Sequence, residues 1–182
     1  MRLAVAAMVL LAAFGARAQE GAFLSEAEAP RAVFPRADGF ERREVPATPE
    51  RRTKVTQALG GALPSMWEER WVVFRVSSDG TNVGWAIIVE EIGKHRPITF
   101  VVGLRPDRSV EDVAVMSYRE AYGGEIRSPR FLRQYAGKTP QDDLRAYQGV
   151  KNIAGATLSV EAASRAVHKA QAIATLLDEA GS

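Results

Sequence analysis

Apolar residues recur at every third or fourth position in the C-terminal part of the chain. This stripe predicts an amphipathic helix that packs one face against a core. Ser159 is suited to cap the first free amides of this helix, and Glu161 places a negative charge in its first turn, where the helix dipole favours it. The polar residues His168, Lys169 and Gln171 are expected largely on the solvent side. The stripe itself consists of Val160, Ala163, Val167, Ala170, Ala174 and Leu177.

Runs of β-branched and aromatic residues occupy the middle of the chain. They predict strands at residues 71–77, 82–91, 98–104 and 110–118, and the intervening Ser78-Asp79-Gly80-Thr81 is typical of a hairpin turn. Consecutive strands joined by short turns pair antiparallel. The predicted fold class is therefore α+β: an antiparallel sheet of about four strands, with helices packed on one face of it, including the long C-terminal helix.

Three further helix starts are indicated by a capping residue followed by proline. They are Thr48-Pro49-Glu50, Ser128-Pro129 and Thr139-Pro140. Gly60-Gly61 is expected to end the first of these helices. No internal repeat is found, so the chain after its leader is expected to be one domain.

The first residues have the pattern of an export signal. Arg2 precedes a short apolar run, and Ala16-Arg17-Ala18 forms a cleavage site, so cleavage is expected before Gln19 and the mature protein is expected in the periplasm. The apolar run is short of the about 20 residues that a membrane helix needs, so no membrane span is expected after cleavage. The predicted organisation is a signal peptide at 1–18, a loosely structured lead-in at 19–46 and the domain at 47–182.

Charge and composition exclude several classes of function. The formal net charge of +2 includes Arg2 and Arg17, which leave with the leader, so the mature chain is close to neutral and no nucleic-acid partner is expected. The absence of cysteine excludes disulfides, thiolate metal sites and iron–sulfur clusters. With His95 and His168 as the only histidines, a histidine-based metal centre is not expected either. Redox chemistry would then require an organic cofactor.

A run of very small residues leads into the C-terminal helix. Ala154, Gly155 and Ala156 place the hydroxyl of Thr157 just before a ring of unpaired N–H groups, which is a favourable site for an anion such as phosphate. Small residues before a capping serine are also an ordinary way to enter a helix. The pattern alone leaves both interpretations open.

A family resemblance favours the phosphate interpretation. Ile153-Ala154-Gly155-Ala156-Thr157-Leu158-Ser159 resembles the Ser/Thr-Gly-Ala-Thr signature of the FMN-binding domain found in the flavin-carrying subunits of NADH:quinone and ferredoxin:NAD oxidoreductases. Residues 116–126 and 131–138 resemble the middle segment of that family, and the likeness covers roughly residues 80 to 178. Ala154 replaces the usual Ser or Thr, and residues 150–152 lack the usual acidic residue.

The resemblance implies a cofactor, its attachment and a set of site residues. FMN would be joined to Thr157 through a phosphoester installed by a flavin transferase that uses FAD, with tight noncovalent FMN as the fallback. The loop after the last strand would hold the flavin ring, although a Gly-Gly turn with two tyrosines is also a common exit from a sheet. No catalytic residue is nominated. The candidate cofactor-binding residues are Thr157, Ala156, Gly155, Ala154, Leu158, Ser159, Tyr118, Glu120, Gly123 and Gly124.

The predicted function is that of a periplasmic FMN-binding electron-transfer protein. Its expected partners are a flavin transferase for maturation and periplasmic or membrane redox proteins. Two alternatives remain at this point: a flavin-dependent reductase with a substrate of its own, and a flavin-free periplasmic binding or assembly module with the same fold.

Overall fold

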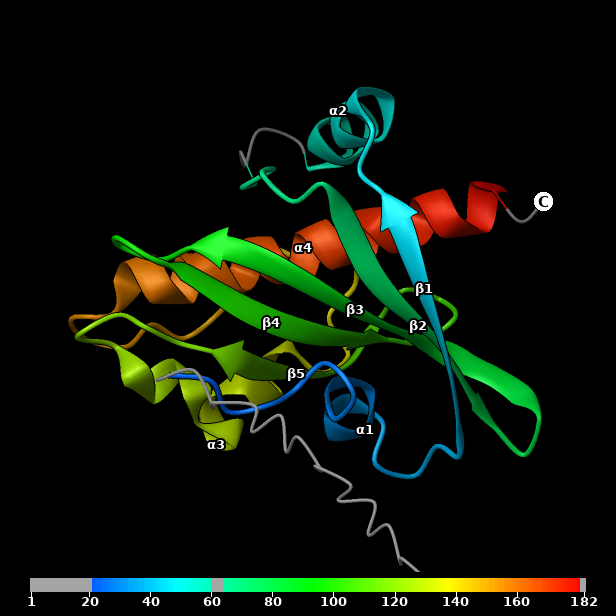
Figure 1. The fold of residues 1–182 in the computed structure, drawn as a ribbon. Helices are drawn as coiled ribbons and strands as arrows, with labels where there is room; N and C mark the ends of the chain where they lie inside the picture. The colour runs from blue at the N-terminus through cyan, green and yellow to red at the C-terminus, as the bar shows by residue number, and fades with distance from the viewer. Residues whose placement is uncertain (1–20, 60–63, 181–182) are drawn as a thin grey trace, which may run out of the picture.

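The computed structural model describes residues 21–59 and 64–180, so the predicted signal peptide and Gly60-Gly61 lie outside the described residues. Figure 1 shows a single sheet with helices around it. The elements are α1 (Ala29–Val33), β1 (Gly39–Pro46), α2 (Pro49–Ala58), β2 (Arg70–Ser78), β3 (Thr81–Ile92), β4 (Pro97–Leu104), β5 (Val110–Ser117), the 3-10 helix η1 (Gly124–Arg127), α3 (Pro129–Leu132), the 3-10 helix η2 (Arg133–Tyr135) and α4 (Thr157–Ala180). Among the described residues, none of these helices has the length and apolar character needed to cross a membrane.

The sheet is antiparallel throughout, and its five strands follow one another in chain order from β1 to β5. This arrangement confirms the predicted α+β class and the long C-terminal helix. The predicted hairpin joins β2 to β3, and Thr48 caps α2 by accepting a hydrogen bond from the amide of Arg51 at 3.4 Å. Ser128-Pro129 begins α3 as predicted, but Thr139-Pro140 lies in a turn and starts no helix.

Residues 21–46 are more ordered than the predicted lead-in. They form α1 and β1, and β1 pairs with β2 along its whole length, from Gly39 opposite Ser77 to Pro46 opposite Arg70. The domain therefore begins well before residue 47. The sequence did not predict this strand because many of its residues are charged. Most of β1 is exposed at the edge of the sheet, where charged residues are compatible with a strand and discourage pairing with another molecule.

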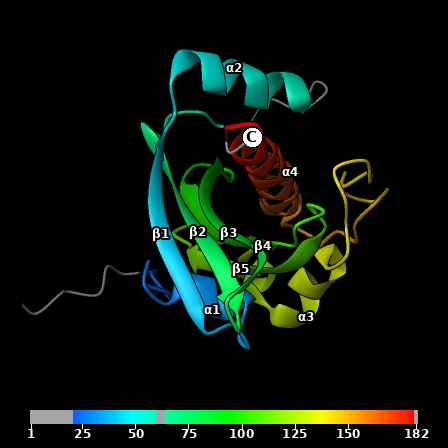
Figure 2. The same cartoon turned by 90° about the vertical axis from the view of Figure 1, so that its right-hand side faces the viewer.

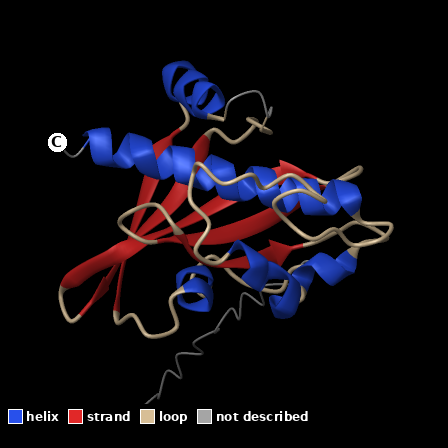
Figure 3. Cartoon of the chain, turned by 180° about the vertical axis from the view of Figure 1, so that it is seen from behind, coloured by secondary structure: helices blue, strands red, loops and turns tan. Residues whose placement is uncertain are grey.

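Helices cover both faces of the sheet, where the sequence predicted helices on one. On one face α4 packs on β3 and β4, with α2 resting against α4. On the other face α1 buries Val33 and Phe34 against a second apolar cluster that includes Phe74 and Val101. Figure 2 views the sheet from its end, and Figure 3 shows α4 running across it from behind. The site thus rests on a sheet that is packed from both sides.

The predicted apolar stripe of α4 is confirmed, but the predicted solvent side is wrong in part. Val160, Ala163 and Val167 are fully buried. So are two polar residues, Lys169 and Gln171, with exposed fractions of 0% and 1%. Helical periodicity cannot reveal this, because the groups that receive these side chains come from distant segments of the chain.

Lys169 is the centre of a buried ionic cluster. Its Nζ donates hydrogen bonds to the carboxylate of Glu68 at 2.6 Å, to the carbonyl of Glu90 at 2.9 Å and to the carbonyl of Ser65. The carboxylate of Glu91, also fully buried, lies 3.7 Å away and accepts a hydrogen bond from the amide of Ser65 at 3.1 Å. These bonds offset the cost of removing the charges from water. They tie α4 to the end of β3 and to residues 64–69.

We expect Lys169→Met to lower the free energy of unfolding by about 3–5 kcal/mol, because it removes the cation of a buried ionic cluster and leaves Glu91 with Arg165 as its remaining ion-pair partner. Methionine keeps most of the side-chain volume, so the loss reports the charge. Urea denaturation measures it, with Arg75→Ala at an exposed strand position as the control, expected to change stability by no more than about 0.5 kcal/mol. An unchanged midpoint for Lys169→Met would contradict the assignment.

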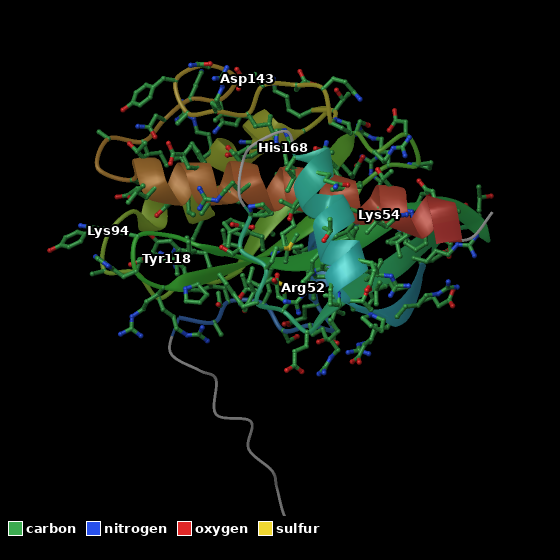
Figure 4. All side chains as sticks on the ribbon, turned by 90° about the horizontal axis from the view of Figure 1, so that it is seen from above. Arg52, Lys54, Lys94, Tyr118, Asp143 and His168 are labelled. Carbon is green, nitrogen blue, oxygen red and sulfur yellow. The ribbon has the colours of Figure 1, made fainter. Side chains whose placement is uncertain are left out.

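His168 is half-buried on α4, whereas the sequence predicted an exposed helix residue. Figure 4 shows it near the loop that carries Asp143. Burial lowers the pKa of His168 below its ordinary value of 6.5, although a hydrogen bond with the backbone of Asp142 and the nearby carboxylates raise it in part. Its Nε2 is buried and has no hydrogen-bond partner among the described residues. The neutral ring is therefore the form that suits the folded state.

The unfolded chain binds a proton on His168 more readily than the folded chain does. The contribution of His168 to the free energy of unfolding is therefore fully present above pH 6.5, and it is lost as the pH falls through the lowered pKa. In His168→Gln this component should be missing, so the decline of stability on acidification should be shallower. Denaturation midpoints across that pH range measure the difference. Identical pH profiles for the two proteins would show that His168 is not responsible.

Candidate functional site

A cavity of about 420 Å³ lies where the turn between β3 and β4, the loop after β5 and the start of α4 meet. In Figure 1 these three segments gather at the left end of the molecule. Five of the predicted site residues form one continuous part of the wall, Gly155 to Ser159, and Glu120 faces them from the loop. Ala154, Tyr118, Gly123 and Gly124 lie outside the lining. The lining residues are Lys94, His95, Glu120, Ala121, Tyr122, Gly155, Ala156, Thr157, Leu158 and Ser159.

The helix begins at Thr157, two residues earlier than the predicted cap at Ser159. A turn closes just before it, with the amide of Ala156 bonded to the carbonyl of Ile153 at 3.0 Å and Gly155 at a φ of 79°. The amide of Val160 makes the first α4 bond, to Ala156 at 3.0 Å. The amides of Thr157 and its two successors precede that bond, so they are the free donors of the helix N-terminus. All three of these residues line the cavity.

Ser159 has a different place from the one predicted. It lies inside the first turn of α4 and is 4% exposed. Its Oγ is 3.2 Å from the hydroxyl of Tyr118. Ser159 therefore joins the helix to the loop after β5, and the turn at residues 153–156 replaces it as the entry to the helix.

The hydroxyl of Thr157 has a defined direction. Thr157 is half-buried, and its Oγ1 accepts a hydrogen bond from Nδ2 of Asn152 at 2.8 Å. This contact fixes the side chain within the cavity wall. The sequence singled out Thr157 but gave no signal for Asn152, because the contact depends on how the turn folds back on the helix.

Tyr118 is a link between elements rather than part of the cavity wall. It is 7% exposed, and its hydroxyl donates a hydrogen bond to the carbonyl of Tyr122 while lying beside Ser159. Burial raises the pKa of Tyr118, and the hydrogen bond with Ser159 offsets part of that rise. The phenol thus stays protonated and keeps its donor. Its contacts fix the path of the loop that carries Glu120.

Gly123 is required where the loop approaches α4. Its φ is 84°, in the left-handed region, and a Cβ there would lie 2.8 Å from the Tyr118 hydroxyl and 3.0 Å from the Cβ of Ala156. Gly124 differs, because a Cβ at that position would meet nothing nearer than the Arg127 side chain at 3.5 Å. The two glycines of the predicted loop therefore have different roles. Only Gly123 sets the distance between the loop and the helix.

Glu120 holds the turn between β3 and β4 over the cavity. Its Oε1 accepts hydrogen bonds from the amides of His95 at 2.6 Å and Arg96 at 2.9 Å. Burial raises the pKa of Glu120, but the bonds from the backbone of His95, Arg96 and Lys94 together outweigh it, so the net pKa is lowered. A Cβ at Gly93 would lie 2.8 Å from the same oxygen, so this contact depends on glycine. In this structure the carboxylate positions the turn, in addition to facing the cavity.

Lys94 and His95 are site residues that the sequence did not indicate. Both are exposed, and Glu120 brings them to the cavity. Figure 4 shows Lys94 at the same end of the molecule as Tyr118. In the sequence they stand in an ordinary polar turn, with more than 60 residues between them and Thr157. The pairing of β4 with β3 on one side and β5 on the other brings this turn to the loop that carries Glu120.

The cavity fits a ligand with a phosphate and a flat apolar body. Its volume lies within the range of about 300–1,000 Å³ common for small-molecule sites. The free amides of α4 and the charge of Lys94 suit a phosphate, whereas Tyr122 and Leu158 expose 83% and 49% of their surface beside it. Within the described part of the chain, no group of three or more His, Cys, Asp or Glu residues could hold a metal ion.

Comparison with known proteins agrees with this description. The family model of the FMN-binding domain matches residues 93–172, a range that contains every residue lining the cavity. No curated protein matches the chain. The family match confirms the resemblance predicted from the sequence and supports FMN as the cofactor.

We expect Gly123→Ala to destabilise the protein, because a left-handed backbone costs a residue with a Cβ about 1–2 kcal/mol and the new methyl group would press on Tyr118 and Ala156. Gly124→Ala is the matched control, since its Cβ has room, and should change stability by no more than about 0.5 kcal/mol. Chemical denaturation compares the two. Equal losses would mean that the close approach at Gly123 is not a constraint.

Proposed function

We propose that this protein is an exported FMN-binding electron carrier in which Thr157 holds FMN through a phosphoester bond. One observation carries the proposal. The Thr157 side chain lines a cavity beside the free amides of α4, within the segment matched by the FMN-binding domain model. The predicted leader, residues 1–18, favours export to the periplasm.

In this proposal, different residues of the site bind the phosphate and the ring of FMN. The amides of Thr157, Leu158 and Ser159 donate hydrogen bonds to the phosphate, and Lys94 offsets its charge. Tyr122 and Leu158 provide apolar surface for the ring. Bound FMN supplies the ability to accept and release electrons, and the protein orients it and tunes its potential.

A covalent bond explains how an open site would keep its cofactor. The N-terminus of a helix contributes about 0.3–1 kcal/mol toward a negative charge, whereas micromolar binding requires about 8 kcal/mol. The helix alone cannot retain FMN. A tether prevents dissociation and keeps the ring at a high effective concentration near its cavity.

The attachment step requires a flavin transferase with FAD as its co-substrate. Oγ1 of Thr157 forms a bond to the phosphorus on the flavin side of FAD, the bond from that phosphorus to the AMP oxygen breaks, and AMP leaves with the electron pair. The proton of the threonine hydroxyl passes to the medium. Asn152, bonded to Oγ1, orients the oxygen for this step. Periplasmic or membrane redox proteins would then exchange electrons with the tethered FMN.

The intact mass of the exported protein tests the proposal. After coexpression with a flavin transferase, the wild type should gain the mass of one FMN less one water, and Thr157→Val should gain nothing. Thr157→Ser, which keeps a hydroxyl, should be modified at least in part. Circular dichroism of Thr157→Val checks that the variant is folded.

The other outcomes are also decisive. Yellow protein with an unmodified mass would support FMN as the cofactor and reject the tether, leaving noncovalent binding. A folded, colourless wild type would reject FMN binding and favour a flavin-free module. Modification that persists in Thr157→Val would place the bond on another residue.

A further inference from the structure

Two segments that contribute residues to the cavity wall are rich in positive charge. The turn at residues 93–96 and the segment 118–134 together contain six Lys or Arg residues and two Glu residues, a net charge of +4. Residues 19–182 as a whole are neutral, because the formal charge of +2 equals the two arginines of the predicted leader. The remainder of the mature chain is therefore net negative. In the sequence, residues 97–117 separate the two segments, and the sheet brings them together.

Three of these cations lie in or next to the segments that form the cavity. Lys94 lines the cavity. Arg96 lies in the same turn, and its backbone amide donates a hydrogen bond to the carboxylate of Glu120. Arg127 lies at the end of η1, with its guanidinium 4.4 Å from the ring centre of Phe23 and bonded to the carbonyl of Gly124 at 3.1 Å. All three are exposed, and within residues 21–59 and 64–180 none of the ion pairs involves them. Their charge is therefore available to a partner.

We propose that this basic rim, formed by Lys94, Arg96 and Arg127, docks the acidic face of a protein redox partner over the cavity. The inference rests on the proposed function, since the cavity is where the flavin would be reached. Tyr122 and Leu158 also line the cavity, are exposed and supply a small apolar surface there. Opposite charges steer such an encounter, and a small interface lets the partner leave quickly.

The chain offers a matched pair of variants for the test. Lys94→Glu with Arg96→Glu reverses two charges on the rim. Arg36→Glu with Arg75→Glu makes the same change in net charge at exposed positions on the other end of the sheet, close to the turn between β2 and β3. Neither pair alters Thr157 or the backbone contacts of Glu120. The two variants make the same change in net charge. Because Lys94 also faces the phosphate in the proposed function, equal rates for the rim variant and the wild type at high salt check that the flavin site is intact.

The experiment measures electron transfer to the FMN-loaded protein from an acidic [2Fe–2S] ferredoxin, one electron leaving each reduced cluster for the flavin. In the wild type the second-order rate constant should fall by about tenfold as ionic strength rises from about 20 mM to about 300 mM. The rim variant should be about tenfold slower at low salt and nearly insensitive to salt, whereas the control variant should stay within about twofold of wild type. Basic cytochrome c, oxidising the reduced protein, should show the opposite salt dependence.

A rim variant as fast as the control variant, or a wild-type rate that rises with salt, would overturn the proposal. The proposal would also fail if the wild type bound anionic phospholipid vesicles, the rim variant did not, and the two reacted with ferredoxin at the same rate. The rim would then bind a membrane surface. If the protein contains no FMN, the proposed function fails separately. Calorimetric binding of ferredoxin to the Thr157→Val protein, with and without the rim substitutions, still decides whether the rim docks an acidic protein.

Discussion

The hydroxyl of Tyr118 joins the end of the sheet to the beginning of the long helix, and the candidate site depends on this junction. The Tyr118 hydroxyl donates a hydrogen bond to the carbonyl of Tyr122 and is also hydrogen-bonded to the hydroxyl of Ser159 on α4. Gly123 makes the junction possible, because any larger residue would push the loop away from the helix. Thr157 lies on the helix immediately beside it. The position of the candidate acceptor oxygen is therefore set by the sheet as well as by its own turn.

Two carboxylates connect the rest of the molecule to this junction. Glu120 holds the turn that carries Lys94 and His95, so the third wall of the cavity is fixed from the same loop. Farther along α4, Glu91 and Lys169 hold the helix against the end of β3. The helix is thus restrained at its start and near its middle. A shift of α4 along the sheet would break contacts at both places, which keeps Thr157 at a constant distance from the cavity's opposite wall.

The parts that the sequence predicted are those governed by local pattern. Alternating strands, short turns and the alanine-rich stripe of α4 each follow from neighbouring residues, as does the run from Gly155 to Thr157 that starts the helix. β1 escaped prediction because its exposed face is charged and its pairing with β2 is a long-range contact. Lys169 was placed in solvent for a similar reason, since its partners are contributed by β3 and residues 64–69. Lys94 became a site residue only through the fold.

The most direct measurement is the identification of the flavin-carrying peptide in protein exported from a host with a flavin transferase. Trypsin should release residues 152–165, which contain Thr157 together with Ser159 and Ser164 as internal alternatives. We predict that flavin fluorescence elutes with this peptide and that fragmentation assigns the FMN phosphate to Thr157. FMN released as a free compound, or found on Ser159 or on a peptide from elsewhere in the chain, would contradict the account.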